Sequence, residues 1–100
     1  MMRIDWTLAA EVDLDEIVRY IAQESIVNAV AFDERVQERV ELLAQFPESG
    51  RPGRISGTRE HISPHDRYCV VYQVQGDAVS ILRIIHGGQE WPLGFEPLGD

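Results

Sequence analysis

Three arginines and a histidine in the second half of the chain could act together on an anionic group. They are Arg59, Arg67, Arg83 and His86. Guanidinium groups bind phosphate, and an imidazole beside a cation is a candidate general base because the neighbouring charge lowers its pKa. If Gly76-Asp77 is the loop of a two-residue hairpin, Arg67 lies directly opposite His86. The structural alternative is that Arg67 and His86 are exposed to water on one face of a sheet. Arg83, which lies in an apolar strand, would then form a structural ion pair with a carboxylate.

Other reactive side chains give weaker patterns. His61 and His65 are four residues apart with Asp66 beside them, but the intervening proline removes a shared helical face, so we expect no metal site. Cys69 has no histidine and acid in its sequence setting and is typical of a small buried hydrophobe. No glycine-rich segment follows a strand and opens a helix, so we expect no cofactor.

Charge is distributed unevenly along the 100 residues. The chain holds 17 Asp and Glu, nine Arg and no Lys, for a net charge of −8. Residues 1–50 carry four Arg against eleven acids, whereas residues 51–86 carry five Arg against three acids. The excess of acid opposes non-specific binding to nucleic acid, although a local Arg cluster can still bind an anion. The chain shows no signal peptide, no long apolar run and a single cysteine, so we expect a cytoplasmic protein.

Hydrophobic periodicity predicts the elements that position these side chains. Polar and apolar residues alternate over 3–7, which predicts a short strand. Apolar residues three and four positions apart predict helices over 8–24 and 25–45, with a Ser or Thr cap before each. A turn of a few residues between them predicts an antiparallel helical hairpin. Residues 46–57 hold two Pro and three Gly and are expected to form loops.

The remaining segments predict three strands, over 58–62, 67–75 and 78–86. The two-residue loop gives the last two strands a register and assigns their side chains to faces. The face expected to meet the helices carries Tyr68, Val70, Tyr72, Val74, Val79, Ile81, Arg83 and Ile85. The opposite face carries Arg67, Cys69, Val71, Gln73, Ser80, Leu82, Ile84 and His86. The predicted architecture is α+β: a strand, a helical hairpin and a three-stranded antiparallel sheet.

Several short segments, taken in order, resemble one protein family. They are AEVDLDEI at 10–17 with YI at 20–21, PESGR at 47–51, GTRE at 57–60, YCVVY at 68–72, and IIH at 84–86 running to WP at 91–92. Together they are similar to the toxins of the RelE/ParE superfamily from bacterial type II toxin–antitoxin modules. The resemblance implies one toxin domain over 1–92 with a C-terminal tail, 93–100. It also implies a cognate antitoxin as partner.

The resemblance leaves two targets open. RelE-like members cleave messenger RNA on the ribosome; in that case Arg59, Arg83 and His86 are the catalytic positions of a metal-independent endoribonuclease. ParE-like members inhibit DNA gyrase without catalysis; Arg59, Arg67 and His86 are then target contacts. The absence of Lys and the charge of −8 favour gyrase, because a nuclease must stabilise developing negative charge.

A third alternative is a non-toxic module that only binds an antitoxin, since the acidic helices would repel anionic targets. Antitoxins typically dock such toxins with a helical or extended segment. We expect that segment to be rich in Lys and Arg. The expected antitoxin contacts are Glu11, Asp15, Glu34, Glu38 and Glu41.

Overall fold

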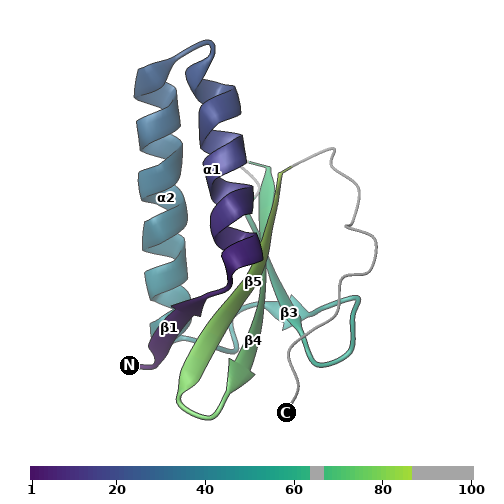
Figure 1. Ribbon diagram of the computed structural model, residues 1–100. Helices are drawn as coiled ribbons and strands as arrows, with labels where there is room; N and C mark the ends of the chain where they lie inside the picture. Colours follow the sequence, from purple (N-terminus) through teal and green to yellow (C-terminus); the bar gives the residue numbers. More distant parts are fainter. Residues whose placement is uncertain (64–66, 87–100) are drawn as a thin grey trace.

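The computed structural model describes residues 1–63 and 67–86 (Figure 1). The elements in chain order are β1 (Arg3–Trp6), α1 (Leu8–Ala22), α2 (Ile26–Gln45), β2 (Arg51–Pro52), β3 (Arg59–Ser63), β4 (Tyr68–Gln75) and β5 (Ala78–His86). The predicted order of strand, helical hairpin and three strands is confirmed. A further two-residue strand, β2, lies in the segment expected to be loop. The predicted tail, 93–100, lies outside the described residues.

The helical hairpin begins and ends as its sequence predicts. The side chains of Thr7 and Ser25 cap the two helices by accepting hydrogen bonds from backbone N–H groups three residues later. α2 ends at Gln45 because Phe46 precedes a proline and avoids the helical region. The two helices lie side by side and run in opposite directions (Figure 1). No helix in residues 1–63 and 67–86 has the length and apolarity to span a bilayer.

A five-stranded sheet lies against the hairpin, with strand order β1-β5-β4-β3-β2. β1 is parallel to β5, from Arg3 opposite Ala78 to Trp6 opposite Ile81, and the other neighbouring strands are antiparallel. β1 and β2 therefore form the two edges of the sheet.

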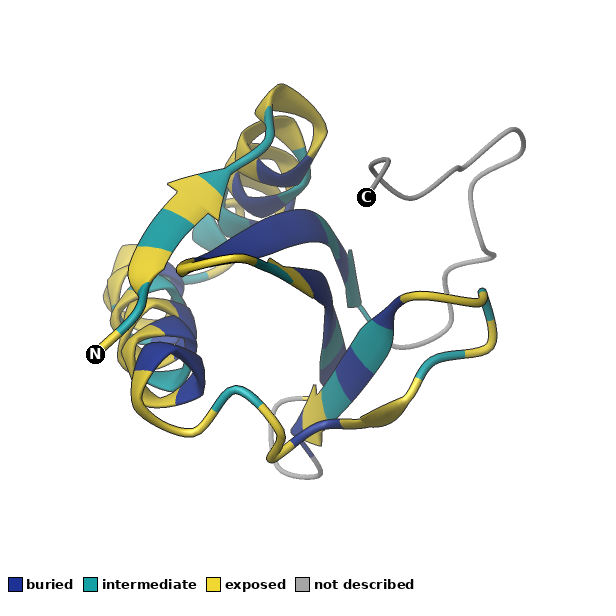
Figure 2. Cartoon of the chain, turned by 90° about the horizontal axis from the view of Figure 1, so that it is seen from below, coloured by how far each residue is buried: buried dark blue, intermediate teal, exposed yellow. Residues whose placement is uncertain are grey.

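The core lies between the hairpin and the central strands. Figure 2 shows the buried residues on the facing sides of the helices and of β4 and β5. The helices contribute Ala10, Leu14, Ile17, Phe32, Val36, Val40 and Leu43, and the strands contribute Tyr68, Val70, Tyr72, Val79, Ile81 and Ile84. Most of these residues are those that the periodicity predicts, so the apolar stripes identify the buried faces.

The predicted register of β4 and β5 holds near the loop and fails beyond it. Pairs from Gln75–Ala78 to Tyr72–Ile81 follow the two-residue hairpin, but Val71 then lies opposite Arg83. Leu82 is thus the extra residue of a β-bulge, which shifts every later pair by one.

The bulge overturns the predicted pairing of Arg67 with His86. Tyr68 lies opposite His86 instead. Arg67 precedes β4 and adopts a left-handed backbone conformation with φ of 56°, so it is a turn residue. The prediction that an Arg–His pair faces outward across the hairpin is therefore wrong.

The bulge also exchanges the side chains that meet the helices. Ile84 lies in the core, and the His86 ring packs edge-on against Phe32 of α2 with 5.7 Å between ring centroids. The prediction that Arg83 and Ile85 occupy this face is wrong. The Thr7 hydroxyl donates to the carbonyls of both residues at the bulge, Ile81 at 2.9 Å and Leu82 at 3.0 Å, where β1 ends.

Candidate functional site

Arg83 is joined to α1 by a two-point ion pair. Its Nε and Nη2 atoms each lie 2.7 Å from an Asp13 carboxylate oxygen, and the Ile84 N–H donates to the same carboxylate at 3.0 Å. The side chains are 26% and 11% exposed for Arg83 and Asp13. Because β1 ends at Trp6, Asp13 caps the part of β5 that β1 leaves uncovered. The hydrogen bonds from Arg83 to Asp13 raise the pKa of Arg83. The positive charge of Arg83 therefore joins β5 to α1.

Arg59 organises the loop that precedes β2. Its Nη1 atom donates to the backbone carbonyls of Gly50 at 2.8 Å and Glu48 at 3.3 Å. Tyr72 lies opposite Arg59 on β4; its hydroxyl accepts from the Gly50 N–H at 2.9 Å and donates to the Pro47 carbonyl at 2.8 Å. A Cβ on Gly50 would lie 2.6 Å from that hydroxyl, so the close approach requires glycine. The loop is therefore fixed from two neighbouring strands.

The three residues predicted for a nuclease site are not brought together. Arg59 and Arg83 lie on β3 and β5 with β4 between them, so their backbones are about 10 Å apart. His86 lies opposite Tyr68, and Arg59 lies opposite Tyr72. Tyr68 and Tyr72 are four residues apart on β4, so His86 and Arg59 are separated by roughly 13 Å along the strand direction alone. The guanidinium of Arg83 is bound to Asp13 and that of Arg59 to the carbonyls of Glu48 and Gly50, so the three side chains do not converge on one point.

The predicted target contacts are also dispersed. Arg67 is exposed in the turn before β4, and His86 is half-buried against Phe32. Arg59 lies nearer the opposite end of β4 and is half-buried by the loop that it binds. These residues can contact a target only as points along an extended surface, because they do not form one pocket.

Glu60 is a buried carboxylate that its sequence does not single out. It is 1% exposed and accepts hydrogen bonds from the Arg54 N–H at 2.8 Å and from Arg51 Nη2 at 3.3 Å. Burial favours a raised pKa, but the hydrogen bonds from Arg54 and Arg51 outweigh it and hold the pKa of Glu60 below its ordinary value. Burial, and then the charge of Glu60, raise the pKa of the Cys69 thiol to about 11. Glu60 lies opposite Val71 on β4. No pattern in the sequence around Glu60 predicts that its side chain is buried.

Metal ligation has no arrangement to support it in the described residues. Within 1–63 and 67–86, no three His, Cys, Asp or Glu side chains lie where they could hold one ion. His65 and Asp66, which the sequence places near His61, lie outside those ranges.

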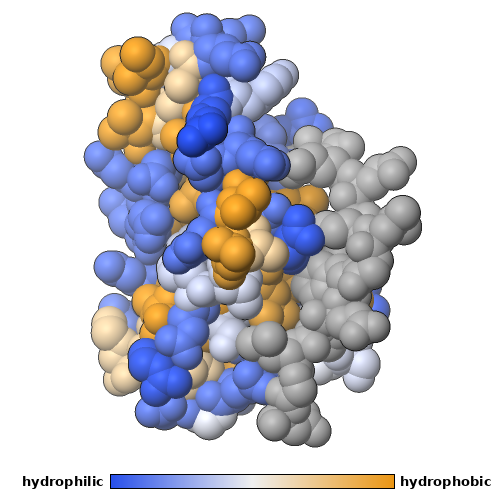
Figure 3. Space-filling view, in the orientation of Figure 1, coloured by the Kyte–Doolittle hydropathy of each residue, from blue (hydrophilic) through white to orange (hydrophobic). Residues whose placement is uncertain are grey.

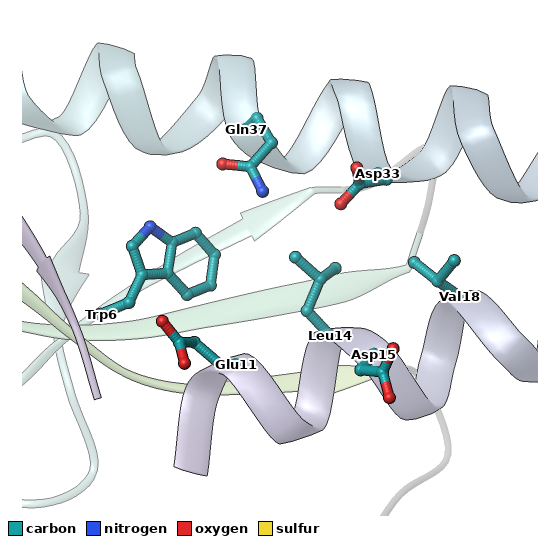
Figure 4. A pocket seen from close by; sticks show the side chains of 7 residues that line it. All are labelled: Trp6, Glu11, Leu14, Asp15, Val18, Asp33 and Gln37. Atoms are coloured by element: carbon teal, nitrogen blue, oxygen red, sulfur yellow. The ribbon is translucent and has the colours of Figure 1, made fainter. Parts of the chain in front are cut away.

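The acidic side chains expected to meet an antitoxin are exposed on the hairpin, and they form two groups. Glu34, Glu38 and Glu41 are exposed on α2, and Figure 3 shows both hydrophilic residues and apolar patches over the hairpin. Glu11 and Asp15 instead border a groove of about 370 Å³ between α1 and α2 (Figure 4). The complete lining is Trp6, Glu11, Leu14, Asp15, Val18, Asp33 and Gln37. Asp33 and Trp6 are members that the sequence did not predict.

The fold is similar to that of a solved toxin–antitoxin system. A chain of the chromosomal ParDE system from P. aeruginosa matches with a TM-score of 0.76 and 28% identity, covering 87% of this chain and 97% of that chain. The hairpin against a five-stranded sheet is therefore the fold of a component of such a toxin–antitoxin system.

Sequence comparison identifies the family. The toxin-like protein Y4kP of Sinorhizobium fredii is 42% identical over 90 residues, which are 90% of this chain and 93% of Y4kP. Toxin RelE2 of Caulobacter vibrioides is 32% identical over 89% of this chain and 99% of its own length. The family model for the ParE toxin of the type II toxin–antitoxin system parDE matches residues 4–91, and the chain belongs to this family. The resemblance to the RelE/ParE superfamily is confirmed.

Proposed function

We propose that this type II toxin inhibits DNA gyrase in the cytoplasm, without catalysis, and that a cognate antitoxin neutralises it. The observation that carries the proposal is the position of Arg83, which is paired with Asp13 and lies apart from Arg59 and His86. Cleavage of RNA needs cations and an acid or base around one phosphate. The ion pair with Asp13 argues against the use of Arg83 as one of these cations.

The charge of the chain supports the same target. A nuclease that works on the ribosome approaches a dense phosphate surface, and a protein with a net charge of −8 and no Lys is repelled by it. The membership of the ParE family and the similarity to a ParDE system point in the same direction. The 32% identity to a protein named Toxin RelE2 keeps ribosome-dependent cleavage as the second candidate.

The target surface that we propose lies at the two ends of β4, because most residues within the strand are buried. Arg67 supplies an exposed cation at one end of the strand, and His86 lies beside it on the next strand. Arg59 acts at the other end, where it shapes the loop that ends at Gly50. Antitoxin docking is assigned to the other layer of the fold, the acidic helical hairpin.

Expression of the chain alone tests the target. We expect growth arrest with double-strand DNA breaks and an SOS response, and we expect purified protein to inhibit gyrase supercoiling in the absence of ribosomes. Arg67→Ala should weaken both effects. Arg19→Ala is the matched control, because it also removes one exposed guanidinium but lies on α1, away from β4.

Two other results contradict the proposal. Ribosome-dependent cleavage of messenger RNA that is lost in His86→Ala identifies the nuclease instead. Binding to the antitoxin with no growth arrest identifies a non-toxic module.

A further inference from the structure

The groove between α1 and α2 combines an apolar floor with an acidic border (Figure 4). The side chains of Leu14 and Val18 on α1 and of Trp6 at the end of β1 form the floor. The carboxylates of Glu11, Asp15 and Asp33 surround it. An α-helix with its side chains is about 10–12 Å across, so a groove of about 370 Å³ accepts one long side chain rather than a whole helix.

The carboxylates at this groove are poorly neutralised by the chain itself. Asp15 pairs with Arg19 at 3.1 Å, but both side chains are exposed and such a pair contributes only a few tenths of a kcal/mol. Neither Glu11 nor Asp33 forms an ion pair or side-chain hydrogen bond with the described residues. Glu11 has a structural explanation, because an acid in the first turn of a helix is stabilised by the helix dipole. Asp33 is half-buried in the middle of α2 and has none.

We propose that this groove receives an Arg or Lys side chain carried by a basic amphipathic helix of the antitoxin. The aliphatic stem would lie over Leu14 and Val18, and the cationic group would lie between Glu11 and Asp33 beside the Trp6 indole. The inference rests on the proposed neutralisation by an antitoxin and names the side-chain chemistry that achieves it.

Charge complementarity selects this occupant. The hairpin, residues 8–45, carries nine acids against three Arg, so it attracts cations and repels nucleic acid. A second copy of the chain that presented its own hairpin would bring an equally acidic surface. An apolar helix would leave Asp33 without a partner after the groove is closed to water, which costs free energy. The stem of an Arg or Lys side chain from a basic helix covers the apolar floor, and its charge pairs with the carboxylates of the border.

Neutralising the border tests the proposal. The probe is the full-length antitoxin encoded by the adjacent gene, titrated by calorimetry at 0.15 M salt. We expect Glu11→Gln/Asp33→Asn to raise the Kd at least tenfold and to weaken the dependence of the Kd on salt. Glu24→Gln/Glu48→Gln is the matched control, because it removes two exposed charges outside the groove and should change the Kd less than twofold. Equal effects of the two double variants would overturn the proposal.

Trp6 gives a direct readout of the groove. The chain has two tryptophans, so Trp91→Phe leaves Trp6 as the only one. With an antitoxin whose own tryptophans are replaced by Phe, we expect the Trp6 emission to shift on complex formation. Binding with unchanged emission would place the antitoxin elsewhere and overturn the proposal. If the chain alone does not arrest growth, the toxin function fails, whereas these binding measurements still decide the groove.

Discussion

Replacement of Asp13 by Asn removes one charge of the ion pair with Arg83 and changes little else in shape. One carboxylate oxygen of Asp13 accepts from both Arg83 Nε and the Ile84 N–H, and the other accepts from Arg83 Nη2. An Asn carbonyl in place of the first oxygen can keep the bonds from Arg83 Nε and the Ile84 N–H, but the Asn NH₂ group then faces Arg83 Nη2, which can only donate. The variant therefore leaves Arg83 partly buried without its ion-pair partner.

The expected loss of stability follows from the burial of the two side chains. Removing one partner of a fully buried ion pair costs about 3–5 kcal/mol. Arg83 is 26% exposed, so water compensates for part of the loss, and we expect about 2–3 kcal/mol. For a domain of this length 1 kcal/mol lowers Tm by about 4–8 °C, which gives a decrease of about 10–20 °C.

Urea unfolding followed by circular dichroism measures this loss, provided that the m-value stays constant. A double-mutant cycle with Arg83→Met isolates the pair from the other contacts of Asp13. Asp15→Asn is the control, because the exposed pair with Arg19 should contribute less than about 0.5 kcal/mol. A coupling energy for Asp13 and Arg83 no larger than that control would refute the scaffold role of Arg83.

Three further outcomes follow from the other buried polar groups. Glu60→Gln should destabilise the protein by about 1–2 kcal/mol at pH 7 through weaker bonds to Arg54. Because the folded-state pKa of Glu60 lies below 4.5, its carboxylate stabilises the protein above that pH, and this stabilisation is lost as the pH falls through the folded-state pKa. If the stability of the variant depends on acid pH in the same way as that of the original protein, the prediction is wrong. Tyr72→Phe removes two hydrogen bonds at the Gly50 loop and should cost about 1–3 kcal/mol and speed proteolysis of that loop, whereas unchanged cleavage would show that the loop is held by other contacts. With a pKa of about 11, Cys69 should react with a disulfide reagent at pH 8 roughly a hundredfold more slowly in the folded protein than in urea; equal rates would exclude the burial of the thiol.

Local physical chemistry explains which parts of the fold the sequence predicts. Thr7 and Ser25 are hydroxyl caps followed by apolar residues at helical spacing, and both begin helices. Phe46 before proline ends α2 at the expected residue, and Gly76-Asp77 forms the hairpin loop. Each of these features depends on neighbours within a few positions of the chain.

The features that the sequence does not predict depend on distant contacts. The bulge at Leu82 is favoured by Thr7, 75 residues earlier, and it changes the partners of both Arg83 and His86. Arg83 in an apolar strand indicated a partner, but the choice of Asp13 requires the packing of α1 against β5. The sequence predicts Glu11 and Asp15 of the groove as acids on one face of α1. Their combination with Asp33 exists only in the folded hairpin.

The parallel pairing of β1 with β5 sets the order in which the protein can be completed. Thr7 and Ile81 are 74 residues apart in the chain, whereas the α1–α2 hairpin needs only local contacts. During synthesis the hairpin can form early, but β1 has no partner until β5 has left the ribosome, because such distant pairing must await both segments. A chain that stops before Ala78 lacks the strand that receives β1, Thr7 and Asp13. The finished toxin therefore exists only after nearly all of the chain has been made.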